Sequence, residues 1–163
     1  MIKLVSTVGF IIINQENKVL LIKHCKENEK EEIEKDDKLI LPKKEKEEVV
    51  EEEWMIPFST VEEDDNLRDV LRKEVKKCLN CEINDCNYFN LYFYNISDSF
   101  IKKVSYFYGT IVGEAKTKNG TKSIEWVSLE KKEINRLSLM SEQKEVLNNF
   151  IDFFQDKFLE KME

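Results

Sequence analysis

Acidic side chains gather in the middle of this chain. Glu62, Glu63, Asp64 and Asp65 follow one another in a polar stretch, and Glu74 comes further along. Carboxylate oxygens are the hard ligands that magnesium prefers. Acids also suit the start of a helix, because the positive end of the helix dipole favours negative charge. These residues therefore suit the entry of a helix and offer oxygen ligands to a cation.

The acids lie between a strand-like piece and a helix. The strand-like piece begins at Trp54, and the helix follows the acidic loop. Apolar residues recur there at three- and four-residue steps, which places them on one helix face. These residues are Leu67, Val70, Leu71, Val75, Cys78 and Leu79. Residues 54–83 therefore form one strand–loop–helix unit.

This unit resembles the Nudix box of the Nudix hydrolases, in a degenerate form. In that family a Pro-Gly-Gly turn leads to Val-Glu and Gly-Glu, and a helix then carries Arg-Glu-x-x-Glu-Glu. Here Pro57, Val61, Glu62 and Glu74 match the family pattern, and Lys73 keeps the positive charge of the arginine. The resemblance implies the family's fold and a site built around this helix.

The departures from the box fall into two kinds. Asp64 and Asn80 replace glycines, and both residue types tolerate positive φ, so we expect the loop backbone to survive. Lys77 and Cys78 replace the paired metal-binding glutamates. A lysine three residues after Glu74 lies on the same helix face and places a positive charge near the expected cation.

The resemblance also implies roles for single residues. In the family, Mg²⁺ or Mn²⁺ held by box carboxylates polarises a phosphate and helps to generate the attacking hydroxide. Carried over to this chain, the metal ligands are Glu74, Asp65 and Glu62, and the catalytic residues are Glu74 and Lys73. The alternative for Glu74 is a helix carboxylate that forms an ion pair with Lys77.

Loss of the paired glutamates decides the functional prediction. We predict weak or absent hydrolase activity and a role as a nucleotide-binding or protein-interaction module, with a nucleotide-type small molecule as ligand. The alternative is a divergent Mg- or Mn-dependent hydrolase that cleaves a nucleoside diphosphate linked to another group. That alternative needs substitute ligands, such as Glu125 or an acid of the 26–53 segment.

Two aromatic residues flank the box and are candidates for substrate binding. Trp54 precedes Pro57, and Phe58, followed by Ser59, stands where the family has its first glycine. Both aromatic rings could stack on a nucleotide base. The alternative is that they belong to the apolar core.

Four cysteines offer a second kind of chemistry. Cys78, Cys81 and Cys86 lie close together in sequence, and Cys25 follows the only histidine, His24. Such a set could bind zinc. We favour the core interpretation, because Cys78 falls on the apolar face of the helix and reduced cysteines behave as small apolar residues.

Apolar, β-rich runs make up most of the remaining chain. Residues 3–13 and 19–24 are joined by a polar turn, which predicts a β-hairpin covered on both faces. Residues 87–94 and 101–112 predict a second antiparallel pair. The run 123–129 predicts a last strand. It is similar to the family's ending, through Glu125, Trp126, Val127 and Leu129.

Residues 141–161 predict an amphipathic C-terminal helix that begins at Ser141. We expect its apolar stripe, from which Phe153 is excluded, to pack on the sheet; a homodimer contact is the alternative. The resemblance implies the fold class α+β, the α/β/α sandwich of the Nudix family, with a mixed sheet between the box helix and this helix. We expect one domain over 1–163.

Composition and charge narrow the class of protein. The chain of 163 residues is 41% hydrophobic and carries a net charge of −7, which is typical of a globular protein and disfavours a broad nucleic-acid-binding surface. A local basic patch is compatible with this charge. Segment 26–53 holds 13 acids and 7 lysines, so we expect a solvated insertion, with a lid or partner-binding loop as the alternative. Without a long apolar run or a cleavable leader, we expect a cytoplasmic protein that does not enter a membrane.

Overall fold

The computed structural model describes residues 2–24, 53–117 and 121–162. Segment 26–53, apart from Glu53, therefore lies outside the described residues, as does Cys25. The elements, in chain order, are β1 (Lys3–Ile12), β2 (Lys18–His24), β3 (Phe58–Val61), α2 (Leu67–Leu79), β4 (Glu82–Ser97), β5 (Phe100–Val112), β6 (Thr121–Ser128), α3 (Lys131–Arg136) and α4 (Ser141–Met162).

The strands form two sheets. The larger sheet has the order β3-β1-β5-β4, and β2 pairs with β6 in the smaller one. Within the larger sheet β1 runs parallel to β5, whereas the β3–β1 and β5–β4 pairs are antiparallel. This sheet is therefore mixed, as predicted.

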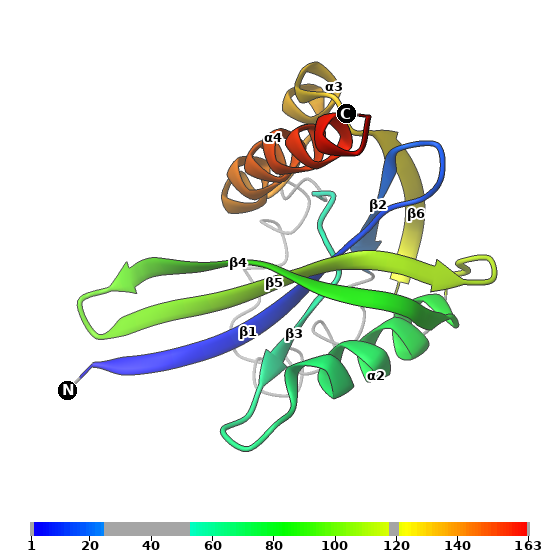
Figure 1. Cartoon of the computed structure of the whole chain (residues 1–163). Coiled ribbons are helices and arrows are strands. Elements are labelled where there is room, and N and C mark those ends of the chain that lie inside the picture. The colour runs from blue at the N-terminus through cyan, green and yellow to red at the C-terminus, as the bar shows by residue number, and fades with distance from the viewer. Residues whose placement is uncertain (1, 25–52, 118–120, 163) are drawn as a thin grey trace, which may run out of the picture.

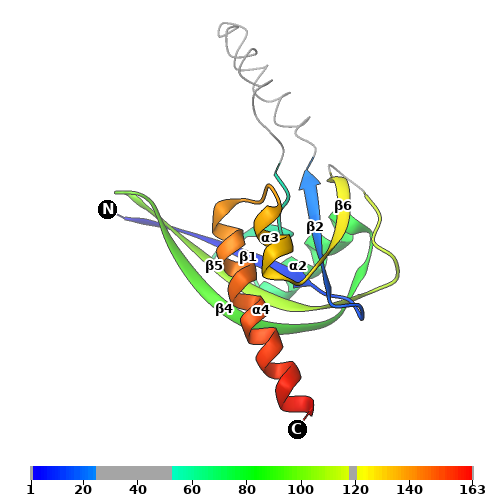
Figure 2. The same cartoon turned by 90° about the horizontal axis from the view of Figure 1, so that it is seen from above.

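Helices cover both faces of the larger sheet. Helix α2 packs on one face and α4 on the other (Figure 1). Figure 2 shows α4 lying across the sheet, with β2 and β6 side by side. This arrangement confirms the α+β sandwich. In the part of the chain that the structure describes, no helix is long and apolar enough to span a membrane.

Strand β1 lies at the centre of the packing, because its alternate side chains enter two different cores. Val8, Phe10 and Ile12 pack with α2, and Ile11 packs with α4. Side chains point alternately to the two faces of a strand, so a strand buried on both faces must be apolar at consecutive positions. This explains the continuous apolar run near the N-terminus and confirms that both faces are covered.

The predicted hairpin between residues 3–13 and 19–24 is wrong. The turn exists, because the Asn14 side chain accepts hydrogen bonds from the backbone N–H groups of Glu16 and Lys18. Only one bridge, between Ile13 and Val19, joins the two runs. Strand β1 then pairs with β3 and β5, and β2 pairs with β6, so the two runs diverge into different sheets.

Two smaller expectations also differ from the structure. Asp64 does not adopt positive φ, whereas Asn80 does, with φ 56° as the left-handed C-cap of α2. Phe153 is not off the apolar stripe of α4. Its ring lies 5.2 Å from Phe89 and 6.0 Å from Phe150, measured between ring centroids. The aromatic side chains of the neighbouring β4 widen the surface that α4 can cover.

Candidate functional site

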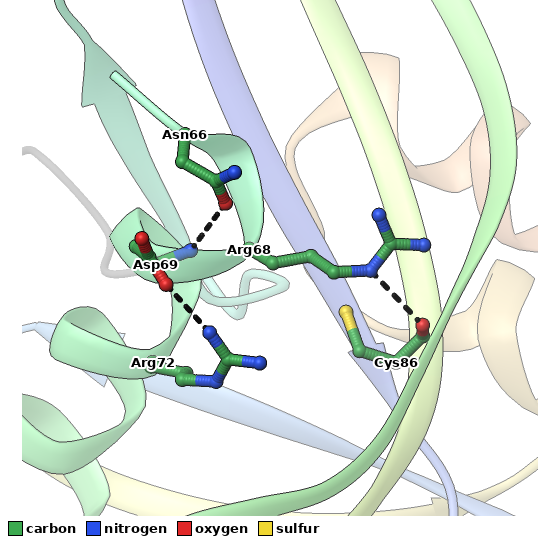
Figure 3. A network of polar contacts seen from close by, with 5 residues as sticks. All are labelled: Asn66, Arg68, Asp69, Arg72 and Cys86. Atoms are coloured by element: carbon green, nitrogen blue, oxygen red, sulfur yellow. Dashed lines mark hydrogen bonds and ion pairs between the residues drawn. The ribbon is translucent and has the colours of Figure 1, made fainter.

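The loop between β3 and α2 is braced by its own side chains. The Asp65 carboxylate accepts a hydrogen bond from the Glu62 backbone N–H at 2.8 Å, and the Asp65 N–H donates to the Glu62 carbonyl at 3.1 Å. Asn66 then caps α2, because its side-chain oxygen accepts from the Asp69 N–H at 3.1 Å (Figure 3). The sequence signal for this cap is an asparagine directly before the apolar period of the helix.

The acids of this loop line a hollow of about 470 Å³ together with β1 and β5. We call it the acidic hollow, and its polar side chains include Glu62, Glu63, Asp65, Ser6, Ser105 and Lys103. Lys103 lies opposite Ser6 on the neighbouring strand, so the parallel β1–β5 pairing brings it to the loop. Three carboxylates outnumber the single ammonium. The hollow therefore suits a cationic group better than a bare phosphate.

Glu74 and Lys73 lie apart from the acidic hollow, further along α2. Glu74 is half-buried, and its carboxylate accepts a hydrogen bond from the Cys78 thiol at 2.9 Å. Lys73 is exposed on the outer side of the helix. The structure thus brings Glu62 and Asp65 together, but Glu74 does not line the same hollow.

This arrangement does not fit a divalent cation held by the box residues. Within residues 2–24, 53–117 and 121–162, no three His, Cys, Asp or Glu side chains are placed to hold a metal ion together. Asp65 is engaged by the Glu62 backbone, and Glu74 by Cys78. The ligand set Glu74, Asp65 and Glu62 stays a prediction, and no reaction step is derived from it.

The described cysteines lie in or beside the core on the α2 side of the sheet. Cys78 and Cys81 are buried and Cys86 is half-buried, which confirms the core position predicted for Cys78. Burial raises the pKa of the Cys81 and Cys86 thiols above the ordinary value. A raised pKa keeps a thiol protonated at neutral pH, and metals bind the thiolate.

The two aromatic candidates are placed away from the acidic hollow. Trp54 packs at the edge of the core that α4 covers, and the Lys23 ammonium lies 4.6 Å above its ring. Phe58 begins β3 opposite Gly9, and the Lys102 ammonium lies 5.8 Å from its ring centroid. Each ring is half-buried and faces a cation. Base stacking by Trp54 and Phe58 stays a prediction.

Polar contacts fasten α2 to the edge strand β4. The Arg68 side chain donates to the Cys86 carbonyl at 3.4 Å (Figure 3). Its guanidinium lies 5.0 Å from the Phe107 ring centroid. One turn further, Arg72 forms an exposed ion pair with Asp69 at 2.5 Å. The Arg68 contact joins α2 to β4, whereas the Arg72–Asp69 pair lies within the helix.

No protein-family model and no curated protein matches this chain. Solved structures do. The MutT protein from Methanosarcina mazei superposes with a TM-score of 0.67 at 15% identity, over 94% of this chain and 96% of that one. A Nudix hydrolase from Nitrosomonas europaea superposes with a TM-score of 0.62 at 13% identity, over 90% of this chain and 87% of that one. A C. elegans Ap4A hydrolase binary complex superposes with a TM-score of 0.60 at 14% identity, over 93% of this chain and 98% of that one.

The chain has the Nudix fold. The match extends over nine-tenths of each chain, so it includes the sheet, α2 and α4 rather than a single motif. At these identities the likeness concerns the fold alone, and the chemistry must be argued from the residues of this chain. Within this Nudix fold, sequence reasoning did not identify the Asn66 cap or the joint position of Lys103 and the loop acids.

Proposed function

We propose that this protein is a Nudix-fold module that binds a nucleotide-type small molecule and has weak or no Nudix hydrolase activity. One observation carries the proposal. Glu74, the box carboxylate that remains on α2, is bound by the Cys78 thiol, and Cys78 occupies one of the two positions where the resemblance implies glutamate ligands. Lys77 occupies the other. Of the three helix positions where the resemblance implies a glutamate, only that of Glu74 therefore carries a carboxylate.

The electrostatic change supports binding rather than cleavage. Replacing two glutamates by a lysine and a thiol makes the local charge of the helix more positive by three units, if the glutamates are ionised. A cation is then held less strongly, whereas the phosphates of a nucleotide can interact directly with lysine and arginine side chains. The Nudix fold would in this way keep its ligand class and lose its metal.

Turnover measurements test this proposal. We expect no product above the metal-only blank when the folded protein meets nucleoside triphosphates, ADP-ribose and dinucleoside polyphosphates, with Mg²⁺ or Mn²⁺. We expect calorimetry to detect binding of at least one of these nucleotides. Turnover that disappears in Glu74→Gln, but survives in the exposed control Glu130→Gln, would contradict the proposal and establish a hydrolase.

A second function, that of a divergent Mg- or Mn-dependent hydrolase, is favoured by the acidic hollow. Two of the three carboxylates of Glu62, Glu63 and Asp65 could bind a largely hydrated cation whose remaining ligands are substrate phosphate oxygens, and Lys103 would contact the same phosphates. This function predicts turnover that requires Glu62 and Asp65 rather than Glu74. Glu62→Gln and Asp65→Asn, measured beside Glu74→Gln, separate the two sites.

A further inference from the structure

A second hollow lies on the other side of α2, between the second half of the helix and the start of β4. It has a volume of about 600 Å³ and is lined by Arg72, Lys73, Lys76, Lys77, Cys81, Glu82 and Ile83. We call it the basic hollow. Four of these seven side chains are cationic and one is anionic. Its charge is therefore opposite to that of the acidic hollow.

The spacing of the four cations is unfavourable for an isolated helix. Arg72 and Lys76 are four residues apart, as are Lys73 and Lys77, so two pairs of like charges face each other on the helix surface. Each such pair destabilises a helix by roughly 0.2–0.5 kcal/mol. The helix dipole favours Lys76 and Lys77 in the last turn, but its effect is confined to the end of the helix. A bound anion would reduce the repulsion that remains between these like charges.

Charges of both signs lie beside the basic hollow. The Lys116 backbone N–H donates to the Leu79 carbonyl at 2.9 Å, which brings the loop after β5 to the end of α2. Burial raises the pKa of the Cys81 thiol; among the nearby charges Lys76 lowers it most, whereas Glu114 raises it and Lys116 lowers it. The nearby acids are Glu82 and Glu114. Arg72 forms an ion pair with Asp69, whereas Lys73 and Lys76 form no ion pair with any residue that the structure describes.

We propose that the basic hollow binds the phosphate chain of a polyphosphate ligand directly, without a metal ion. Lys73 and Lys76 make the main contacts, because their ammonium groups are exposed point charges on the rim. The inference rests on the proposed function and deepens it, since it names where a nucleotide's phosphates lie. The outer face of the box helix, rather than the acidic loop, then carries the ligand.

Calorimetry in EDTA at low salt tests the proposal with three probes: tripolyphosphate, ATP and adenosine. We expect tripolyphosphate and ATP to bind and adenosine not to bind. Lys73→Gln with Lys76→Gln should weaken the binding of both phosphate probes by about tenfold or more, because each charged contact contributes strongly to affinity. The matched control is Lys131→Gln with Lys132→Gln, which removes the same two charges from α3 and should leave both affinities unchanged. Both variants alter exposed side chains, and circular dichroism verifies that they fold.

The outcomes separate this inference from the proposed function. ATP binding that is unchanged in the double variant would overturn the basic hollow as the site and leave the nucleotide-binding module standing. If adenosine binds and tripolyphosphate does not, the basic hollow is likewise overturned as the site, and the nucleotide-binding module again stands. If none of the three probes binds, the inference fails, and the proposed function is then decided by the wider nucleotide panel. Equal loss in the control variant would also overturn the inference, because the effect would then be one of total charge.

Discussion

The hydrogen bond between the Cys78 thiol and the Glu74 carboxylate joins two helix positions at which the resemblance implies metal ligands. It uses one acceptor oxygen of the remaining box carboxylate. Cys78 is 2% exposed, so its thiol approaches Glu74 from the core side of the helix. Substitutions on α2 can test whether a cation site can be restored there.

Restoring both glutamates should restore cation binding. We expect Lys77→Glu with Cys78→Glu to be less stable than the parent in EDTA, because a carboxylate is placed at a buried position. Mg²⁺ at ten times its Kd should return about 1.4 kcal/mol of stability, since it binds the folded state only. Thermal unfolding with and without Mg²⁺ measures this, with Lys132→Glu as control. An unfolding midpoint of the double variant that does not change with Mg²⁺ would show that the family's box has been aligned to the wrong residues of this chain.

At the scale of elements, α2 depends on defined caps at both ends. Asn66 satisfies the Asp69 N–H at the start, and Asn80 ends the helix in the left-handed conformation, with its N–H donating to the Lys76 carbonyl. The cap at the start also fixes where the acidic loop ends. Loss of this cap should therefore loosen the loop as well as the helix.

Asn66→Ala should lower the free energy of unfolding by about 1 kcal/mol, because one helix N–H loses its partner. Asn66→Asp is the matched control, since an aspartate caps equally well, and it should be near neutral. Urea unfolding followed by circular dichroism gives both values. Equal stability of Asn66→Ala and the parent would mean that the cap contributes nothing in solution.

At the scale of the whole molecule, buried tyrosines beneath α4 couple folding to pH. Burial, followed by the charges of Glu142 and Glu145, raises the pKa of Tyr94 to about 12. Burial also raises the pKa of Tyr106. In the unfolded chain both would titrate near pH 10. Between about pH 10 and 12 the unfolded state thus loses protons that the folded state keeps, so stability falls as pH rises.

Urea midpoints measured from pH 8 to pH 11.5 should stay level up to about pH 10 and then decrease. Tyr94→Phe should reduce the slope above pH 10. It should cost little stability at pH 8, because the Tyr94 hydroxyl is buried and has no hydrogen-bond partner among the described residues. An unchanged slope in this variant would assign the alkaline transition to other groups.

The sequence by itself determined the fold class, the strand–loop–helix unit at 54–83 and the two covering helices, because these features depend on local periodicity and on a motif. It also placed Cys78 in the core. The different pairing partners of β1 and β2 were not predictable from the turn between them. The hydrogen bonds that Asn14 accepts form a local turn, and such a turn is compatible both with a hairpin and with the two diverging strands observed here.

Only the tertiary structure decided which charged residues share a hollow. Lys103 meets the loop acids because β1 and β5 pair in parallel across about a hundred residues of sequence, and no local pattern encodes that register. The basic hollow likewise needs β4 to pass beside the outer face of α2. The helix period alone groups the four cations, but their enclosure against Glu82 and Ile83 arises from packing between elements.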